Sequence, residues 1–380
     1  MGKSTNSQIH YFDALNNQPL NDAAKLGFEQ ALTHAWSEPS RLYSSSRKSR
    51  QLLEEARNSI AQKLHLKPSE VFFGPGFPFI FSHLVRGLMR GESCQNKKIL
   101  ISNIEQSALL SSARNFSQVI LEVKNEALVD SAEFVSKLTP DIGLAILQFA
   151  NHEVGTKQPI EEIYKSCTAN RIPLLVDATM TFEIAQLKDN FDILVLNPVS
   201  WQGPAGLSVV AIRDEVEFVT TLKRDKRENR KFPAFPHVPL AISTAAALEE
   251  TSQKLITNKR VIQDLQKRLI DEISTISGAR VLTNSTNSLI NIISAIFEDI
   301  DGETLVHELD KNGYEISSGS SCVADEIAPS HVMQAIGEAG GTNIRVSLPV
   351  DLDEAAALGF INSLNLVIKK IRSESSPVTY

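Results

Sequence analysis

The sequence has little of what builds metal sites and disulfide frameworks. Its 380 residues include 3 cysteines and 8 histidines. The cysteines, Cys94, Cys167 and Cys322, are too few and too scattered for a disulfide framework or a zinc site. The histidines show no spacing typical of metal ligands. We therefore expect a protein without disulfide bridges and without a metal site.

Long apolar runs and an excess of basic charge are also missing. No run approaches the roughly 20 residues of a membrane helix, and the start, MGKSTNSQIHYFD, has no apolar stretch typical of a secretory signal. The formal net charge of -7 argues against nucleic-acid binding, which needs a basic face. The one basic run, KRDKRENRK, is expected to be a solvated loop. We expect a cytoplasmic protein that binds neither membranes nor nucleic acid directly.

Between about residues 70 and 213, apolar runs alternate with helical patterns. The runs are continuously apolar, as in strands covered on both faces: EVFFG, KKILISN, GLAILQFA, IPLLVDA, FDILVLN and LSVVAIR. The helical patterns between them include FIFSHLVRGLMR, SALLSSARNF and IEEIYKSCTANR. Strand, helix and strand in succession predict an α/β fold with a mainly parallel sheet. Ligands of such sheets bind beyond the carboxyl ends of the strands.

After residue 240 the pattern changes. A long helical stretch without proline covers about residues 241–274, and it is followed by SLINIISAIF, GETLVHELDKNG, YEISSGSSC and a final helix, DEAAALGFINSLNLVIKKIR. These segments predict a smaller α+β domain, with the long helix as the hinge. We place the large domain at residues 14–245 and the small domain at residues 1–13 and 246–380.

Short motifs in a fixed order cover nearly the whole chain: YFDALNNQP, SEPSRLY, EEAR, VFFGPGFPF, NIEQSALL, ANHEVGTKQPI, VDATM, NPVSWQGPAG, SSGSSC and NIRVSL. This ordered set resembles the cysteine desulfurases of the class V aminotransferase family, which have the fold type I scaffold of pyridoxal phosphate (PLP) enzymes. The resemblance implies a mainly parallel sheet of the seven-stranded type in the large domain, and a homodimer. It also implies a PLP-binding lysine and a cysteine that takes the substrate's sulfur as a persulfide.

The lysine that the resemblance implies is absent. Alignment on the QGPAG segment places it at Ser200, and places the histidine that precedes it in the family at Val199. No lysine occurs between Lys188 and Lys223, so a shifted alignment does not supply one. PLP chemistry requires a lysine that forms an imine, which serine cannot do. A few relatives on this fold keep PLP with histidine in place of lysine, so the rest of the pocket decides.

At the other positions that contact PLP in the family, the expected polar donors are replaced as well. Pro78 stands at the threonine of the phosphate loop, and proline offers neither a hydroxyl nor an N–H. Phe235 falls near the threonine donated across the dimer, Gln106 at the ring-stacking histidine, His152 at the asparagine facing the ring hydroxyl, and Met180 at a glutamine. Each charge-assisted hydrogen bond lost removes about 1.5–3 kcal/mol. We expect no cofactor; PLP binds only if the lysine-free pocket still holds it.

Three positions keep the family's residue. Asp177 corresponds to the aspartate that pairs with the pyridinium nitrogen, Arg345 to the arginine that binds the substrate carboxylate, and Cys322 to the sulfur acceptor. Each also has a plain structural interpretation. Asp177 at a strand end caps the following turn, Arg345 forms an ion pair in the small domain, and Cys322 is an unreactive thiol, since reactivity requires the thiolate.

Two classes of function fit this pattern. We favour a protein that has lost PLP binding and desulfurase activity and works as a partner or scaffold in sulfur transfer, iron–sulfur assembly or tRNA thiolation. It would form a homodimer, or a heterodimer with an active paralogue. The alternative is a PLP-independent enzyme: a sulfur carrier using Cys322, or a site where Arg345 and Asp177 hold a carboxylate-bearing ligand. An active cysteine desulfurase is the remaining alternative.

Overall fold

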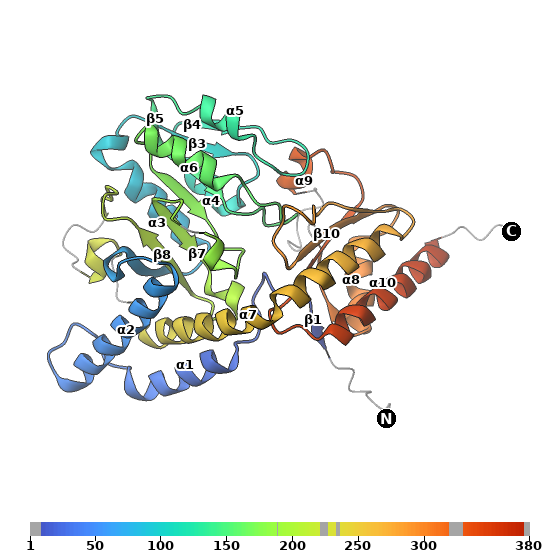
Figure 1. Ribbon diagram of the computed structural model, residues 1–380, viewed down its shortest axis with the longest axis horizontal. Helices are drawn as coiled ribbons and strands as arrows, with labels where there is room; N and C mark the ends of the chain where they lie inside the picture. Colours follow the sequence, from blue (N-terminus) through green and yellow to red (C-terminus); the bar gives the residue numbers. More distant parts are fainter. Residues whose placement is uncertain (1–8, 188, 221–226, 233–235, 319–329, 376–380) are drawn as a thin grey trace.

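A seven-stranded sheet forms the larger part of the chain, in the order β2-β8-β7-β6-β5-β3-β4 (Figure 1). The structure is a computed structural model that describes residues 9–187, 189–220, 227–232, 236–318 and 330–375. Strand β8 runs antiparallel to β2 and β7, and the other neighbours are parallel. The predicted α/β class with a mainly parallel sheet is confirmed. The strands are β2 Val71–Pro75, β3 Lys98–Ser102, β4 Gln118–Leu121, β5 Ile142–Gln148, β6 Leu174–Asp177, β7 Ile193–Leu196 and β8 Leu207–Ile212.

Every continuous apolar run predicted as a strand of this sheet is one, but β4 was not predicted. Among the strands that the structure describes, β4 pairs with β3 alone, at the edge of the sheet. Ile120 of β4 is 46% exposed, so this strand is not covered on both faces and lacks the long apolar run of its neighbours.

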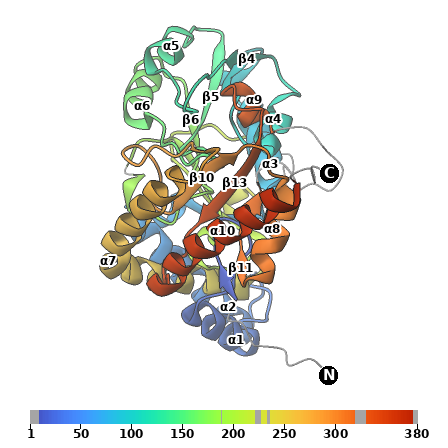
Figure 2. The same cartoon turned by 90° about the vertical axis from the view of Figure 1, so that its right-hand side faces the viewer.

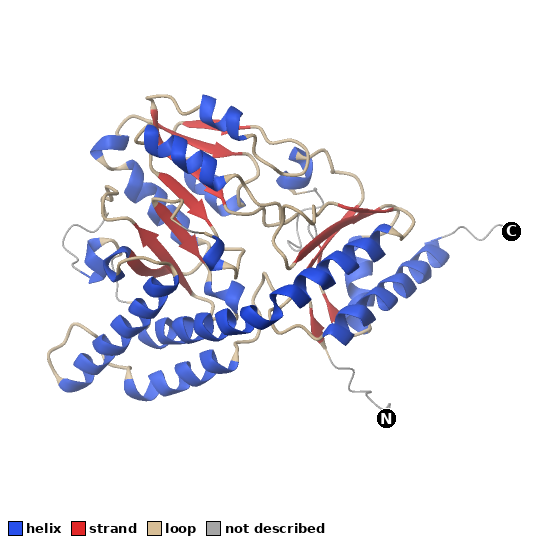
Figure 3. Cartoon of the chain, viewed as in Figure 1, coloured by secondary structure: helices blue, strands red, loops and turns tan. Residues whose placement is uncertain are grey.

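Helices cover both faces of the large sheet (Figure 3). Successive side chains of a strand point to opposite faces. Ile99 and Ile101 of β3 therefore pack with α3 and α4, whereas Leu100 belongs to the core on the opposite face. That second core also includes side chains of α2, α6 and α7. The helices are α1 Asp22–His34, α2 Ser44–Lys63, α3 Phe79–Met89, α4 Ser107–Ala113, α5 Ser131–Ser136, α6 Ile160–Ala169 and α7 Val238–Ser274.

A second, antiparallel sheet of four strands follows in the order β12-β13-β10-β9. Helix α10 packs on α8 and α7 beside it (Figure 2), and β1 pairs in parallel with β11. The elements are β1 His10–Tyr11, β9 Ala279–Val281, β10 Ile292–Phe297, α8 Gly302–Lys311, β11 Tyr314–Glu315, β12 Ser317–Ser318, α9 His331–Ala335, β13 Thr342–Ser347 and α10 Glu354–Ser375. This is the α+β region predicted after residue 240. The domain boundaries at residues 13 and 245 stay a prediction.

Helix α7 joins the two parts. It has 37 residues, about 55 Å at the rise of an α-helix. It contacts α1 and α2 on the side of the large sheet, and β9, β10 and α10 on the side of the small one (Figure 1). Within the described residues, none of the helices has the length and apolar character needed to cross a membrane.

One buried amide fastens α7 to the small sheet. Gln266 is 4% exposed, and its Nε2 donates to the carbonyl oxygens of Leu289 at 2.7 Å and Ile292 at 2.8 Å. These carbonyls belong to the segment that leads into β10. Their hydrogen bonds to Gln266 therefore fix where β10 begins against the helix.

Substituting Gln266→Leu should lower the free energy of unfolding by about 1–3 kcal/mol, because two buried carbonyls lose their donor. Urea unfolding followed by circular dichroism measures this. Gln253→Leu is the matched control, since Gln253 lies on the same helix but is exposed and bonds only to Glu249. Equal effects of the two substitutions would contradict the role given to Gln266.

Candidate functional site

Asp177 ends β6 at the carboxyl edge of the large sheet, where ligands of such sheets bind. Its side chain is buried, and both of its oxygens already accept hydrogen bonds from the chain. Nε2 of Gln106 donates to Oδ2 at 2.9 Å. The backbone N–H and Oγ1 of Thr179 donate to Oδ1 at 3.0 Å and 2.7 Å. Gln106, which precedes α4, also donates to Oγ1 of Thr179 at 2.6 Å. These are the contacts of a carboxylate that caps the turn after its strand.

A second buried carboxyl, Glu105, lies next to Gln106 in the chain. Oγ of Ser102 donates to its Oε1 at 2.6 Å, and its Oε2 has no hydrogen-bond partner among the described residues. Burial raises the pKa of Glu105 to about 8, with a further contribution from the charge of Asp177. Burial also raises the pKa of Asp177 to about 6, against the opposing hydrogen bonds from Thr179 and Gln106. At neutral pH, Glu105 is therefore mostly uncharged.

Ser200, which the sequence predicts to stand at the position of the family's lysine, lies in the short 3-10 turn Pro198–Trp201. The side chain is 3% exposed. Its hydroxyl lies 2.9 Å from the carbonyl oxygen of Thr181 and 2.8 Å from that of Asn197, both of which can accept its proton. Val199 beside it is buried as well. This position offers no amine and presents no free hydroxyl to a ligand.

The loop before α3 differs from a phosphate-binding helix start. Pro78 immediately precedes the helix and gives it no side-chain cap. The N–H groups of Phe79 and Phe81 donate to the carbonyl oxygens of Gly76, at 3.1 Å, and Pro78, at 3.3 Å. A β-carbon on Gly76 would lie 2.8 Å from the backbone of Gly206. The glycine of this loop is therefore required by packing against the Gly206 turn, independently of any phosphate.

Arg345, on β13, is held by groups of the chain. Its Nη2 lies 3.0 Å from Oδ1 of Asp13, and its Nη1 donates to the carbonyl oxygen of His152 at 2.9 Å. The side chains of Arg345 and Asp13 are only 12% and 15% exposed, so the ion pair is largely shielded from water. The charge that would bind a substrate carboxylate is thus neutralised by Asp13.

His152 connects this ion pair to α9. Burial lowers its pKa to about 3, with smaller contributions from the charges of His331 and Arg345, so the ring is neutral. Its ring centroid lies 6.0 Å from that of His331, whose Nε2 is 2.8 Å from the carbonyl oxygen of Glu105. Ser330 donates to Oε2 of Glu153 at 2.7 Å. The start of α9 is therefore fastened to the edge of the large sheet.

The remaining predicted positions contribute less. Met180 is partly buried and packs against the core. Phe235 and Cys322 lie outside the described residues. Cys94 and Cys167 are buried, and burial raises the pKa of both thiols, that of Cys167 to about 12. No group of three or more His, Cys, Asp or Glu side chains in the described ranges is arranged to hold a metal ion.

Sequence reasoning missed Glu105, Thr179 and His331. The signal for Glu105 is an acidic residue three positions after the end of β3, on the edge where sites form. Thr179 is two residues beyond Asp177, the spacing of a turn around an aspartate. Nothing in the sequence indicates His331, because its contact with residue 105 spans 226 residues of chain.

The residues predicted to stand at the family's PLP positions do not fit the cofactor. Ser200 cannot form an imine, the oxygens of Asp177 accept from Gln106 and Thr179, and two N–H groups at the start of α3 are bonded within their own loop. These residues concern three parts of the cofactor: Asp177 the ring nitrogen, Ser200 the aldehyde, and the loop before α3 the phosphate.

The uncharged form of Glu105 has a consequence for stability. Because the pKa of Glu105 is raised from 4.5 to about 8 in the folded chain, the contribution of this group to the free energy of unfolding is full below about pH 4.5. The contribution falls as the pH rises from there to about 8. Glu105→Gln keeps the shape and the acceptor for Ser102 without the charge. Its unfolding free energy, measured in urea at pH 5 and pH 8, should fall less between these values than that of the wild type. A parallel fall in both proteins would contradict the assignment.

The class-V aminotransferase family model matches residues 26–356. Cysteine desulfurase IscS of Methanosarcina thermophila is 27% identical over 342 residues, covering 88% of this chain and 85% of that protein. Cysteine desulfurase IscS 1 of Archaeoglobus fulgidus is 26% identical over 381 residues, covering 96% and 98%. Among solved structures, a NifS-like protein has a TM-score of 0.86 at 21% identity, covering 96% of this chain and 100% of that one. The apo cysteine desulfurase of Thermococcus onnurineus NA1 has a TM-score of 0.82 at 17% identity, covering 95% of each chain. At these identities the two structures establish the fold alone.

Proposed function

The chain belongs to the class-V aminotransferase family, and we propose that it is a cysteine desulfurase-like protein that no longer binds PLP and acts through protein contacts. The observation that carries this proposal is the hydrogen bonding of Asp177 by Gln106 and Thr179. In the family this aspartate pairs with the pyridinium nitrogen.

Asp177 already accepts three hydrogen bonds, so the cofactor ring would have to share Oδ2 with Gln106 or displace it. Asp177 is 2% exposed, and a hydrogen bond to a charged group contributes about 1.5–3 kcal/mol. Gln106 is also predicted to stand at the position of the ring-stacking histidine. Its side chain therefore takes the place of that histidine and also bonds to the aspartate that pairs with the pyridinium nitrogen in the family. Gln106 and Thr179 donate hydrogen bonds to both oxygens of the buried Asp177 carboxylate, so this carboxylate is satisfied without a ligand.

On the substrate side, Arg345 already has a partner within the chain. A carboxylate approaching Arg345 would compete with the Asp13 ion pair, which is already 3.0 Å long and largely buried. An incoming amino acid would also lose its hydration before gaining this contact. These features support a protein without desulfurase activity. We propose that it is cytoplasmic and works as a partner in sulfur transfer, iron–sulfur assembly or tRNA thiolation.

An exposed apolar stretch between α1 and α2 suits a protein interface. Trp36, Leu42 and Tyr43 are 69%, 84% and 55% exposed. Exposed aromatic and apolar side chains gathered in one surface segment mark sites of protein interaction. We place a subunit contact here, with a second copy of this chain or with an active paralogue.

Purified protein incubated with PLP and dialysed should show no absorbance band between about 320 and 450 nm. Ser200→Lys alone should not restore a stable band, since the phosphate loop and the contacts of Asp177 stay unsuited to PLP; a loss of two hydrogen bonds is worth at least about a hundredfold in affinity. Borohydride reduction and peptide mapping separate a specific adduct from PLP on surface lysines.

A stable yellow wild-type species would overturn this proposal. The protein would then be expected to be an active desulfurase, to be tested with cysteine as the substrate and Cys322→Ala as the first variant. A Ser200→Lys protein that binds PLP with its adduct at residue 200 would show that the remaining contacts still suffice.

The subunit contact has its own test. Leu42→Ser combined with Tyr43→Ser should raise the dimer dissociation constant at least about tenfold, because central aromatic and apolar contacts dominate such interfaces. Sedimentation equilibrium measures it. Ile256→Ser is the control, since Ile256 is 84% exposed on α7, away from this stretch in the chain. A monomeric wild type, or a dimer unaffected by the double substitution, would count against the contact.

A further inference from the structure

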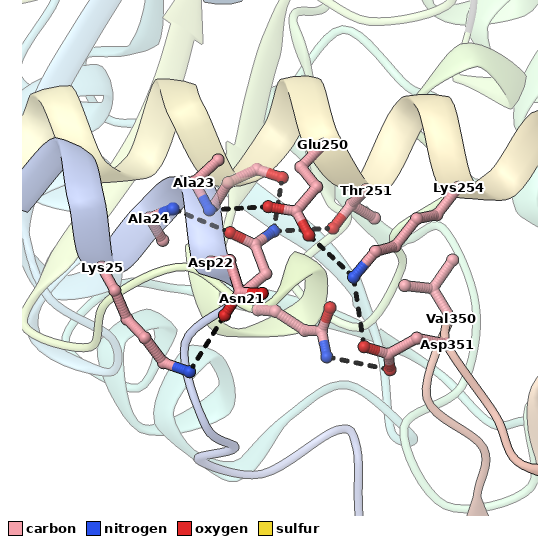
Figure 4. Close-up of polar contacts among 12 residues, drawn as sticks. Asn21, Asp22, Ala23, Ala24, Lys25, Glu250, Thr251, Lys254, Val350 and Asp351 are labelled. Atoms are coloured by element: carbon pink, nitrogen blue, oxygen red, sulfur yellow. Dashed lines mark hydrogen bonds and ion pairs between the residues drawn. The ribbon is translucent and has the colours of Figure 1, made fainter.

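The two edges of the large sheet differ in how their backbone groups are paired. An edge strand presents N–H and C=O groups that no neighbouring strand bonds, and buried groups of this kind need another partner. Side chains supply such partners elsewhere in the chain. At the start of α1, Oε2 of Glu250 accepts from the N–H of Ala23 at 2.7 Å (Figure 4). Oδ1 of Asn21 accepts from the N–H of Ala24 at 2.9 Å.

The edge at β2 is closed by side chains in the same way. Nη1 of Arg57 donates to the carbonyl oxygen of Val71 at 2.6 Å, and the N–H of Phe73 donates to Oε2 of Glu228 at 3.2 Å. Pro75 ends the strand and has no N–H to pair. The side chains of Arg57 and Glu228 are only 8% and 2% exposed. This buried ion pair therefore makes the hydrogen bonds that a further strand would make.

The opposite edge, at β4, is open. The carbonyl oxygen of Ser117 accepts from the N–H of Ile99 of β3 at 2.9 Å. Because successive residues of a strand direct their backbone groups to opposite sides, those of Gln118 and Ile120 point away from β3. Within the described ranges, no segment pairs with these outward groups. The edge therefore offers N–H and C=O groups to a strand from outside the chain.

Strand β4 carries few of the features that protect sheet edges. Charged side chains, proline and bulges are the usual ones, and the sequence of β4, QVIL, has no charge and no proline. Ile120 is 46% exposed. At four residues the strand is short, so an added strand gains few backbone bonds here. A partner would need a second contact.

A hollow of about 280 Å³ continues this edge beyond the end of β4. Its lining begins at Leu121, the last residue of the strand. Among the described residues that line it, Glu122, Asp130 and Glu133 are acidic and Lys124 is basic. The hollow therefore has an excess of negative charge, which a basic group at one end of an added strand would balance.

The chain holds this hollow in a fixed shape. Nε2 of Gln158 donates to the carbonyl oxygen of Ala127 at 2.8 Å, and its Oε1 accepts from the N–H of Val129 at 2.9 Å. Nδ2 of Asn103 donates to Oε2 of Glu122 at 2.8 Å. The wall is thus in place before a partner arrives, and less conformational entropy is lost on binding.

We propose that the β4 edge binds an extended segment of a partner protein that carries basic residues at its amino end. The segment adds as an antiparallel strand, the more stable pairing, with an apolar side chain against Ile120. Its amino end then lies at the hollow, where lysine or arginine faces Glu122, Asp130 and Glu133. This inference depends neither on the loss of PLP nor on the subunit contact proposed above.

A second copy of the chain fits this edge less well. In it, α4 ends at Ala113, and the N–H of Phe116 donates back to the carbonyl oxygen of that residue at 2.9 Å. The chain therefore turns just before β4. An antiparallel β4 from a second copy would bring this turn to the hollow, where the proposed partner is extended.

Calorimetric titration with the peptide acetyl-Lys-Arg-Thr-Val-Thr-Val-amide tests the proposal. The dissociation constant should be about 0.1 mM or tighter at low salt, and at least about threefold larger at about 200 mM salt, because exposed charges are screened. The analogue with Glu-Glu in place of Lys-Arg should bind more weakly. So should the peptide with Lys-Arg at its carboxyl end, which in the antiparallel pairing lies away from the hollow.

Variants of the strand locate the site. Ile120→Lys should weaken binding of the Lys-Arg peptide at least about tenfold, because a lysine on an edge strand opposes pairing. Gln118→Pro removes an outward N–H and no bond to β3, and should weaken binding at least about threefold. Ile256→Lys, at an exposed apolar residue of α7, is the matched control. Hydrogen exchange of the N–H groups of Gln118 and Ile120 should slow in the wild type with peptide.

Variants of the hollow test the charge contact. Glu122→Gln combined with Asp130→Asn should weaken binding of the Lys-Arg peptide at least about threefold, and should leave binding of a Thr-Thr analogue unchanged. Glutamine still accepts from Asn103, and asparagine still caps α5, so the fold is kept.

Four results would overturn the proposal. The first is no binding of the Lys-Arg peptide at about 2 mM, far above the expected constant. The second is equal binding of the Glu-Glu analogue, and the third is unchanged binding in both strand variants. The fourth is a wild-type dimer, seen by sedimentation equilibrium, that Ile120→Lys dissociates, which would assign the edge to a second copy. Circular dichroism establishes folding, and the hollow variants still decide the question if Gln118→Pro does not fold.

Discussion

The buried carboxylate of Asp177 is the constraint on which the rest of the site depends. A charge removed from water at the end of a strand must be paired, hydrogen-bonded or neutralised. Gln106 and Thr179 meet this requirement with groups of the chain itself. Around them, Glu105 is held uncharged by burial, His152 is neutral, and Arg345 is balanced by Asp13. The chain thus supplies partners for both oxygens of Asp177 and for the charge of Arg345, whereas Oε2 of Glu105 and Nδ1 of His152 have no partner among the described residues.

The fold and the predicted site depend on different residues. The strands of the large sheet are held by apolar cores on both faces, and the site lies at their ends. Replacing the polar groups at the strand ends leaves the packing between sheet and helices intact. This explains how a TM-score of 0.86 to a NifS-like protein can accompany 21% identity.

The sequence allowed most of the large sheet to be predicted, since strands buried on both faces have continuous apolar runs. It did not reveal β4, whose Ile120 is exposed at the sheet edge. At the site, the order of the motifs predicts which positions lack the family's donors, and this stays a prediction. The new contacts were not, because Gln106 and Asp177 are 71 residues apart and Arg345 and Asp13 are 332 apart. Pairing over such distances depends on the folded chain and leaves no local pattern.

The length of α7 has a mechanical consequence. Its first half is packed against α1 and α2, and its second half against β9, β10 and α10. A single α-helix of 37 residues without an internal proline bends only gently. A force that tilts one end of α7 therefore tilts the other end, because the helix moves as a rigid body. A protein that docks on the α1–α2 side and one that docks beside the small sheet would therefore both change the orientation of α7.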